Sequence, residues 1–136
     1  MSVKSMSKTT ARTRPMRIAV WQNCRMAELA PQVRQRSAVE VKGMIDRGVT
    51  FEFVDVRTEH EVAIARIAGA RLLDQEYHDA LLAMDRETPM VFSCHHGVRS
   101  QQAAEYFRQH GFRNLTNLAG GIDAWSRDVD PSVPRY

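Results

Sequence analysis

Short apolar runs alternate along most of the chain with stretches whose apolar positions recur at helical spacing. The apolar runs predict strands at 51–56, 70–73, 90–92 and 114–118. The helical spacing predicts helices at 37–47, 58–64, 77–84 and 100–110, and one more that carries Trp125. Because strands that alternate with helices through short connections form parallel sheets, the pattern predicts an α/β fold with helices on both faces of the sheet.

Polar residues at the starts of two predicted helices define where these helices begin. Ser37 precedes Glu40 by three positions, which is the spacing of a capping box, and Gly48 is a helix stop. Thr58 stands at the N-cap position of the next helix. The two helices therefore have start signals that do not depend on the hydrophobic pattern.

The chain has the size and composition of one ordinary globular domain. It has 136 residues, of which 43% are hydrophobic and 26% are charged. No apolar run reaches the ~18 residues of a membrane span, so we expect no membrane association. The two cysteines, Cys24 and Cys94, are too far apart to suggest a disulfide framework or a metal-binding spacing, which favours a reducing compartment, the cytoplasm.

Both ends of the chain differ in composition from its middle. Residues 1–17 carry five basic side chains and no acid, and we expect a basic, disordered tail. A nucleic-acid-binding arm and a transit-type presequence are the alternatives, but no aromatic residues interleave the bases, so we expect no nucleic acid. We expect residues 18–34 to be an extension that packs on the domain, with Cys24 inert rather than a resolving thiol. The prolines of residues 129–136 predict an extended tail.

Cys94 stands where the predicted strand at 90–92 gives way to a helix that has Ser100 at its N-cap or in its first turn. A loop that turns into a helix N-terminus directs backbone N–H groups and the positive end of the helix dipole toward its concave side. Gly97 lets this loop curl because it lacks a Cβ atom. We therefore expect Cys94 to be a solvent-reachable thiolate at neutral pH. The alternative is an inert core cysteine, since free cysteines are often buried.

The loop after Cys94 holds histidine, glycine, arginine and serine, which suit an anion better than a core. With its preceding strand and the later run at 118–125, it resembles the active-site half of a rhodanese-like sulfurtransferase domain. Upstream, Asp55-Val-Arg57, Glu61 and residues 67–70 resemble the first signature of that family. These motifs occur in the order and spacing of the family.

This resemblance covers about residues 35–125 and implies a domain at 35–128 built on a five-stranded parallel sheet. It implies that Cys94 is the catalytic residue. It also implies that the substrate is bound by the loop residues His95, His96, Gly97, Val98, Arg99 and Ser100. Supporting roles without chemistry fall to Asp55, Arg57 and Glu61.

The sequence departs from the family pattern after Glu61. Val62 stands where relatives usually carry an aromatic residue, and residues 65–70 read Ala-Arg-Ile-Ala-Gly-Ala where relatives have Gly-His-Ile-Pro-Gly-Ala. We expect this change to alter a turn and one wall of the site. It puts the detail of the substrate in doubt and leaves the Cys94 loop untouched.

A thiolate in an anion-binding loop can attack sulfur or phosphorus, and the loop length favours one of them. Four residues separate Cys94 from Arg99, whereas the phosphatases and arsenate reductases that resemble this fold have five. The shorter loop suits the linear approach of sulfur to sulfur, so we expect a rhodanese-type (thiosulfate) sulfurtransferase that forms a Cys94 persulfide. The alternatives are a persulfide relay that docks on a partner protein and, third, a phosphatase or arsenate reductase.

The expected partners are a small anionic sulfur donor and an acceptor, either cyanide or a thiol that is small or carried by a protein. We expect no cofactor, and no metal, because His95, His96 and Cys94 lack a convincing fourth ligand. Two arrangements stay open for Arg99: it binds the anionic end of the donor, or it pairs with Asp55 or Glu61 and holds the shape of the loop. At most one of the two histidines is expected to face the substrate.

Overall fold

The computed structural model of the protein describes residues 31–136. The expected tail at 1–17, most of the expected extension at 18–34 and Cys24 lie outside the described residues. Among residues 31–136, none of the helices combines the length and the apolar character that crossing a membrane requires.

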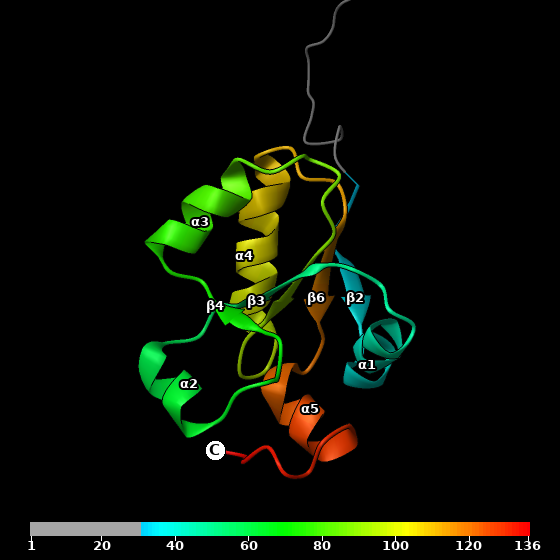
Figure 1. Ribbon diagram of the computed structural model, residues 1–136, viewed down its shortest axis with the longest axis vertical. Helices are drawn as coiled ribbons and strands as arrows, with labels where there is room; N and C mark the ends of the chain where they lie inside the picture. The colour runs from blue at the N-terminus through cyan, green and yellow to red at the C-terminus, as the bar shows by residue number, and fades with distance from the viewer. Residues whose placement is uncertain (1–30) are drawn as a thin grey trace, which may run out of the picture. The chain divides into compact units, whose positions relative to one another are not determined.

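Five strands form one sheet in the described part of the chain (Figure 1). In chain order they are β2 (Arg34–Arg36), β3 (Glu52–Asp55), β4 (Arg71–Leu72), β5 (Met90–Ser93) and β6 (Leu115–Leu118). Their order across the sheet is β2-β6-β5-β3-β4, and every neighbouring pair is parallel. The prediction of a five-stranded parallel sheet is confirmed, and the strand that leads to Cys94 is the central one.

Helices cover both faces of this sheet, as the sequence pattern predicts. They are α1 (Ala38–Asp46), α2 (Glu59–Ile64), α3 (Gln75–Leu82), α4 (Val98–Gln109) and α5 (Gly121–Asp128). Residues of α1 and α5 share one hydrophobic cluster with the sheet, and residues of α3 and α4 share a second. The short helix α2 has no buried residue, so it contributes little to either cluster.

The central strands supply side chains to both clusters because successive residues of a strand point to opposite faces. Val91 of β5 lies in the cluster that contains Trp125, whereas its neighbour Phe92 lies in the cluster that contains Phe107. All four residues of β5 are buried. A strand buried on both faces has a continuous apolar sequence, which is why the run at 90–92 is easy to recognise.

Capping boxes start both of the helices for which the sequence gives start signals. The Ser37 hydroxyl accepts from the Glu40 N–H at 3.1 Å, and the Glu40 carboxylate accepts from the Ser37 N–H at 2.7 Å. Thr58 and Glu61 exchange the same pair of bonds at the start of α2. Glu61 is therefore fixed by its own helix before it meets any residue of the site.

The edge strand β2 is the element that the hydrophobic pattern missed. Its sequence is Arg-Gln-Arg, and Arg34 lies in the segment that we assigned to an N-terminal extension. The strand forms because it pairs in parallel with β6, with Arg34 in register with Thr116 and Arg36 with Leu118. Backbone pairing at a sheet edge needs no apolar side chain, so no hydrophobic pattern predicts this strand.

The helix after Cys94 begins earlier than predicted. Gly97, with φ of 104°, is the N-cap of α4, and Val98 is its first residue. Ser100 is therefore not the N-cap. It lies in the first turn of α4, which is the second of the two positions that the sequence predicted for it. This early start shortens the loop to His95, His96 and Gly97, which brings the helix N-terminus closer to Cys94.

The N-terminus of α5 holds the loop after Cys94 in place through backbone hydrogen bonds. The N–H groups of Ile122 and Asp123 donate to the carbonyl oxygens of Cys94 (2.8 Å) and His95 (3.1 Å). Gly121 has φ of 61°, and a Cβ atom on it would collide with the same two carbonyls. The close approach of two backbone segments thus requires glycine here for both conformational and steric reasons.

Replacement of Gly121 by alanine should destabilise the protein strongly. We expect the free energy of unfolding in urea to fall by about 2–4 kcal/mol, because a strained φ adds to overpacking. Gly48→Ala is the matched control, since Gly48 also has a positive φ, of 76°, but its Cβ would have nothing within 4 Å. Gly48→Ala should lower the free energy of unfolding by only about 1 kcal/mol. Equal losses in the two variants would contradict the anchoring role of Gly121.

Candidate active site

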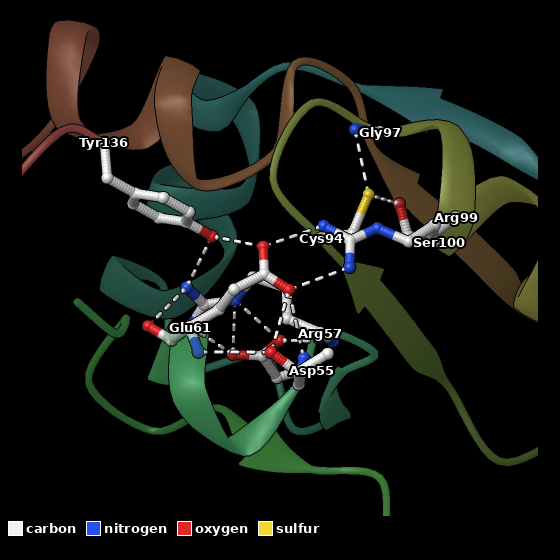
Figure 2. Close-up of polar contacts among 9 residues, drawn as sticks. Asp55, Arg57, Glu61, Cys94, Gly97, Arg99, Ser100 and Tyr136 are labelled. Atoms are coloured by element: carbon white, nitrogen blue, oxygen red, sulfur yellow. Dashed lines mark hydrogen bonds and ion pairs between the residues drawn. The ribbon is translucent and has the colours of Figure 1, made fainter. Parts of the chain in front are cut away.

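The candidate site forms at the edge of the sheet where the parallel strands end. Asp55 and Ser93 are register partners at the carboxyl ends of β3 and β5. Arg57 and Cys94 follow these strands, so they lie at the same edge, where parallel α/β sheets commonly bind ligands. Figure 2 shows Asp55, Arg57 and Cys94 together with Glu61 of α2.

The sulfur of Cys94 lies inside the loop that follows it. The Gly97 N–H donates to Sγ at 3.0 Å, and the Ser100 Oγ lies 3.3 Å from it (Figure 2). The amide faces inward, as expected for an anion cradle. Cys94 is only 1% exposed, however, so the expectation of a solvent-reachable sulfur is wrong for this arrangement. The cause is geometric: the early start of α4 wraps the loop closely around the sulfur.

The pKa of the Cys94 thiol reflects two opposing effects. Burial by itself raises this pKa, because desolvation disfavours the thiolate. Hydrogen bonds from the Ser100 hydroxyl and from the N–H groups of Ser100, Gly97 and His96 outweigh burial, so the net pKa is lowered. Cys94 is thus buried, yet its surroundings favour the charged form of the thiol.

Ser100 links the sulfur to a buried amide network. Its Oγ lies 2.5 Å from Asn117 Oδ1, and Asn117 Nδ2 donates to the carbonyl of Gly97 (3.2 Å) and to the side chain of Gln35 (2.9 Å). A hydroxyl has one proton, so Ser100 donates either to Asn117 or to Sγ at a given moment. The shorter contact assigns the proton to Asn117 when Cys94 is a neutral thiol.

Arg99 adopts the second of the two arrangements left open by the sequence. Its guanidinium donates two hydrogen bonds to the Glu61 carboxylate, at 2.8 and 2.9 Å. The Arg99 pair holds the pKa of Glu61 far below its usual range, and the same pair raises the pKa of Arg99. A two-pronged arginine–carboxylate contact fixes orientation as well as distance, so α2 holds the start of α4.

Asp55 and Arg57 form a buried pair beneath the loop. Arg57 Nη2 lies 2.6 Å from Asp55 Oδ2, Arg57 Nε contacts both carboxylate oxygens, and the arginine side chain is fully buried. The backbone N–H of Arg57 also donates to Asp55. Among the described residues, neither of the two forms a hydrogen bond with the Cys94 sulfur, and the supporting role expected for them stays a prediction.

Tyr136 is a residue of the site that the sequence interpretation missed. Its hydroxyl donates to Glu61 (2.8 Å) and accepts from Arg57 Nη1 (3.0 Å), and its ring stacks on His95 with centroids 4.0 Å apart. Figure 1 shows the chain returning from α5 toward α2 to bring it there. A proline-containing tail carries no pattern that predicts such a return. The one signal in the sequence was the residue type itself, because the hydroxyl of a tyrosine pairs with polar side chains while its ring packs.

The two loop histidines stack on each other, with ring centroids 3.9 Å apart. His95 is inside the stack, between His96 and Tyr136, and its buried Nε2 has no hydrogen-bond partner among residues 31–136. The histidines and Asp123 of α5 have ligand atoms within 4.8 Å of one another, so they could hold a metal ion. The carboxylate already accepts two hydrogen bonds from Arg135, at 3.0 and 3.2 Å, which compete with a metal.

A hollow of about 610 Å³ lies beside the loop, on the side of α4 and β6. His96, Gly97 and Val98 line it from the loop, and the amide side chains of Gln35, Gln101, Gln102 and Asn117 face it. Cys94 is not among the described residues that line it. This hollow therefore borders the loop without opening onto the sulfur.

Loss of the buried carboxylate at position 55 should destabilise the fold. In Asp55→Asn, Arg57 keeps its charge without a counterion, and we expect the free energy of unfolding to fall by about 3–5 kcal/mol. Asp46→Asn is the control, because it removes one acid from an exposed ion pair with Lys42 and should cost less than ~1 kcal/mol. Urea denaturation of both variants measures the difference, and a small loss for Asp55→Asn would show that the pair is dispensable.

Known proteins resemble this chain in sequence. A family model described as a rhodanese-like domain matches residues 37–128. Thiosulfate sulfurtransferase GlpE of Pseudomonas aeruginosa is 38% identical over 100 residues, which cover 72% of this chain and 88% of that protein. Adenylyltransferase and sulfurtransferase MOCS3-2 of Zea mays is 32% identical over 114 residues, which cover 78% of this chain but only 24% of that longer protein.

Solved structures agree with the sequence matches. The rhodanese-like domain protein of Staphylococcus aureus has a TM-score of 0.61 and 27% identity, and the match covers 76% of this chain and 99% of that one. A rhodanese-related protein of Thermoplasma volcanium has a TM-score of 0.60, 26% identity and the same coverage. The resemblance inferred from the motifs is confirmed, and the chain belongs to the rhodanese-like domain family.

Proposed function

We propose that this protein is a thiosulfate-type sulfurtransferase that carries sulfane sulfur on Cys94 as a persulfide. One observation supports it above the others: the Cys94 sulfur accepts a backbone hydrogen bond from Gly97 at the N-terminus of α4, with its pKa lowered. The similarity to thiosulfate sulfurtransferases supports sulfur transfer as the reaction. A thiolate of this kind works best under reducing conditions, so the cytoplasm remains our prediction.

In the first half-reaction the Cys94 thiolate attacks the outer sulfur of an anionic donor such as thiosulfate. A new sulfur–sulfur bond forms to Cys94, the bond between the two donor sulfurs breaks, and sulfite leaves with the electron pair of that bond. No proton has to move in this step, which explains why the site needs no general base near the sulfur.

The loop then stabilises the persulfide. Its outer sulfur carries the negative charge at neutral pH, and the inward-facing N–H groups at the start of α4 can donate to it as they do to the thiolate. Ser100 can turn its proton from Asn117 toward the charged sulfur, because its Oγ contacts both. The same donors thus serve both anionic states of the site.

In the second half-reaction an acceptor removes the outer sulfur. A thiolate, or cyanide, attacks that sulfur, the bond to Cys94 breaks, and the electron pair returns to Cys94 as a thiolate. The acceptor leaves as a persulfide or as thiocyanate. We propose that Arg99 and Glu61 keep the loop in shape throughout, while Asp55 and Arg57 support it from beneath.

Sulfur transfer is favoured over phosphoryl transfer by the size of the loop. Sγ already contacts Gly97 N–H at 3.0 Å across a loop with four residues between Cys94 and Arg99, which leaves little room for a tetrahedral phosphoryl group. Hydrolysis of an aryl phosphate by the purified protein tests this alternative directly. A persulfide relay to a partner protein uses the same Cys94 chemistry and differs only in the acceptor.

Treatment with thiosulfate should add the mass of one sulfur atom to the peptide that contains Cys94. Cys94→Ser should show no such gain, and its rate of sulfur transfer to cyanide should fall at least ~1000-fold, because a serine at this position cannot form the persulfide. Cys24→Ser is the matched control and should keep both the mass gain and the activity. Initial rates over both substrates should follow ping-pong kinetics. Retained turnover in Cys94→Ser would overturn the mechanism.

The lowered pKa of Cys94 should appear in the pH dependence of its alkylation. Only the thiolate reacts, so the rate should rise with pH to a midpoint below the ~8.5 of a free cysteine and then level off. Ser100→Ala removes a donor to the thiolate, so its midpoint should move to higher pH. Iodoacetamide labelling, followed by peptide mass spectrometry, measures both curves. A wild-type midpoint at or above that of a free cysteine would contradict the cradle.

A further inference from the structure

The segment 130–136, here called the strap, lies across the candidate active site although no motif of the sequence pointed to it. It begins with a turn in which the Val133 N–H donates to the Asp130 carbonyl at 3.1 Å. From there it returns from the end of α5 toward α2 (Figure 1). Its course brings Tyr136 next to residues that belong to three other parts of the chain.

Two anchors hold the strap in this place. Val133 is buried in the hydrophobic cluster that contains Trp125. Arg135 donates to the Asp123 carboxylate through Nε and Nη2, at 3.0 and 3.2 Å. The first anchor belongs to the core, whereas the second is exposed and can open at little cost.

Tyr136 is the part of the strap that contacts the site. Its ring stacks on His95, the residue next to Cys94, with an interplanar angle of 10°. Its hydroxyl bridges Arg57 and Glu61. Figure 2 shows the contacts continuing from Tyr136 through Glu61 to Arg99, whose charge also acts on the Cys94 sulfur. Tyr136 therefore contacts the loop through His95 and the Arg99–Glu61 pair through Glu61.

Because Cys94 is buried, the contacts of Tyr136 bear on how substrates reach its sulfur. The sulfur is 1% exposed, and the hollow on the side of α4 and β6 is not lined by Cys94. A donor anion must nevertheless reach this sulfur, and an acceptor must reach the persulfide. In the sheet, β6 and β3 flank β5 on opposite sides. The hollow lies on the β6 side, whereas Glu61, which contacts Tyr136 and Arg99, belongs to the helix that follows β3. The contacts of Glu61 are exposed, so these groups can move.

We propose that Tyr136 is a gating residue that controls access to Cys94. In the closed position Tyr136 stacks on His95 and ties Glu61, and the sulfur is sealed. When the strap swings away about its anchor at Val133, Glu61 and Arg99 are freed to move and a path to the sulfur opens. The gate admits small anionic donors more readily than bulky ones, so Tyr136 sets the size of the substrate. This role deepens the proposed function and rests on it.

The rate of a thiol reagent with Cys94 measures access without requiring sulfur transfer. N-ethylmaleimide and a fluorescein maleimide share one reactive group and differ in size, so together they report on the width of the path. All variants carry Cys24→Ser, which leaves Cys94 as the only thiol. Initial rates are recorded against pH, because the plateau reports access whereas the midpoint reports the pKa of the thiol.

Tyr136→Ala should raise the plateau rate roughly five- to tenfold with N-ethylmaleimide and by more with the fluorescein reagent, since the rate scales with the open fraction. Its midpoint should stay close to the wild-type value, because the donors that lower the pKa of Cys94, which belong to Ser100, Gly97 and His96, are left in place. Tyr136→Phe keeps the stacking and loses the hydroxyl bridge, so its plateau rate should lie between those of the wild type and of Tyr136→Ala. Arg135→Ala should also raise the plateau by loosening the strap.

Tyr106→Ala is the matched control, because Tyr106 is 39% exposed, against 38% for Tyr136, and its hydroxyl contacts His78 of α3. It should leave both plateaus at the wild-type value. An unchanged plateau in Tyr136→Ala, a change of its midpoint alone, or an equal rise in Tyr106→Ala would each overturn the gate. Failure of the proposed function looks different: no variant would take up sulfur from thiosulfate, while the labelling rates would still differ.

Discussion

The hydrogen bond from the Gly97 N–H to the Cys94 sulfur is the interaction on which the site depends. It requires a strand that ends at Ser93, directly before Cys94, a helix that begins at Val98 and a glycine between them with positive φ. The loop cannot relax away from this geometry, because the first N–H groups of α5 hold its carbonyls from below. Two helix N-termini therefore act on one short loop, one stabilising charge on the sulfur and the other fixing the backbone.

Glu61 connects the parts of the site that are distant in sequence. It closes the capping box of α2, binds Arg99 of α4 and accepts from Tyr136 of the strap. Because one carboxylate serves a helix start, the loop clamp and the strap, movement of any one of them is felt by the others. Under the gate proposed above, the buried sulfur would also be shielded from unwanted thiols and oxidants, which would suit the proposed persulfide.

The chain shows which elements can be predicted from sequence and which cannot. Four strands and all five helices of the described part have an apolar run or a spacing that identifies them, and the capping signals at Ser37 and Thr58 are correct. β2 escaped notice because its Arg-Gln-Arg sequence depends on backbone pairing with β6. Of the two positions expected for Ser100, the first turn of α4 is correct and the N-cap is wrong, because Gly97 occupies the cap although serine is a residue type that favours it.

The sequence by itself indicated the parts of the candidate site: a cysteine at a strand-to-helix corner, a glycine that lets the loop curl, and Arg99, with four residues between it and Cys94. These signals are local, since they need only residues that are close along the chain. Tertiary structure alone decided that Cys94 is buried, that Arg99 pairs with Glu61, and that Tyr136 stacks on His95. The Arg99–Glu61 contact joins residues 38 positions apart and the Tyr136–Glu61 contact residues 75 positions apart, and no local pattern of polarity encodes which residues will meet.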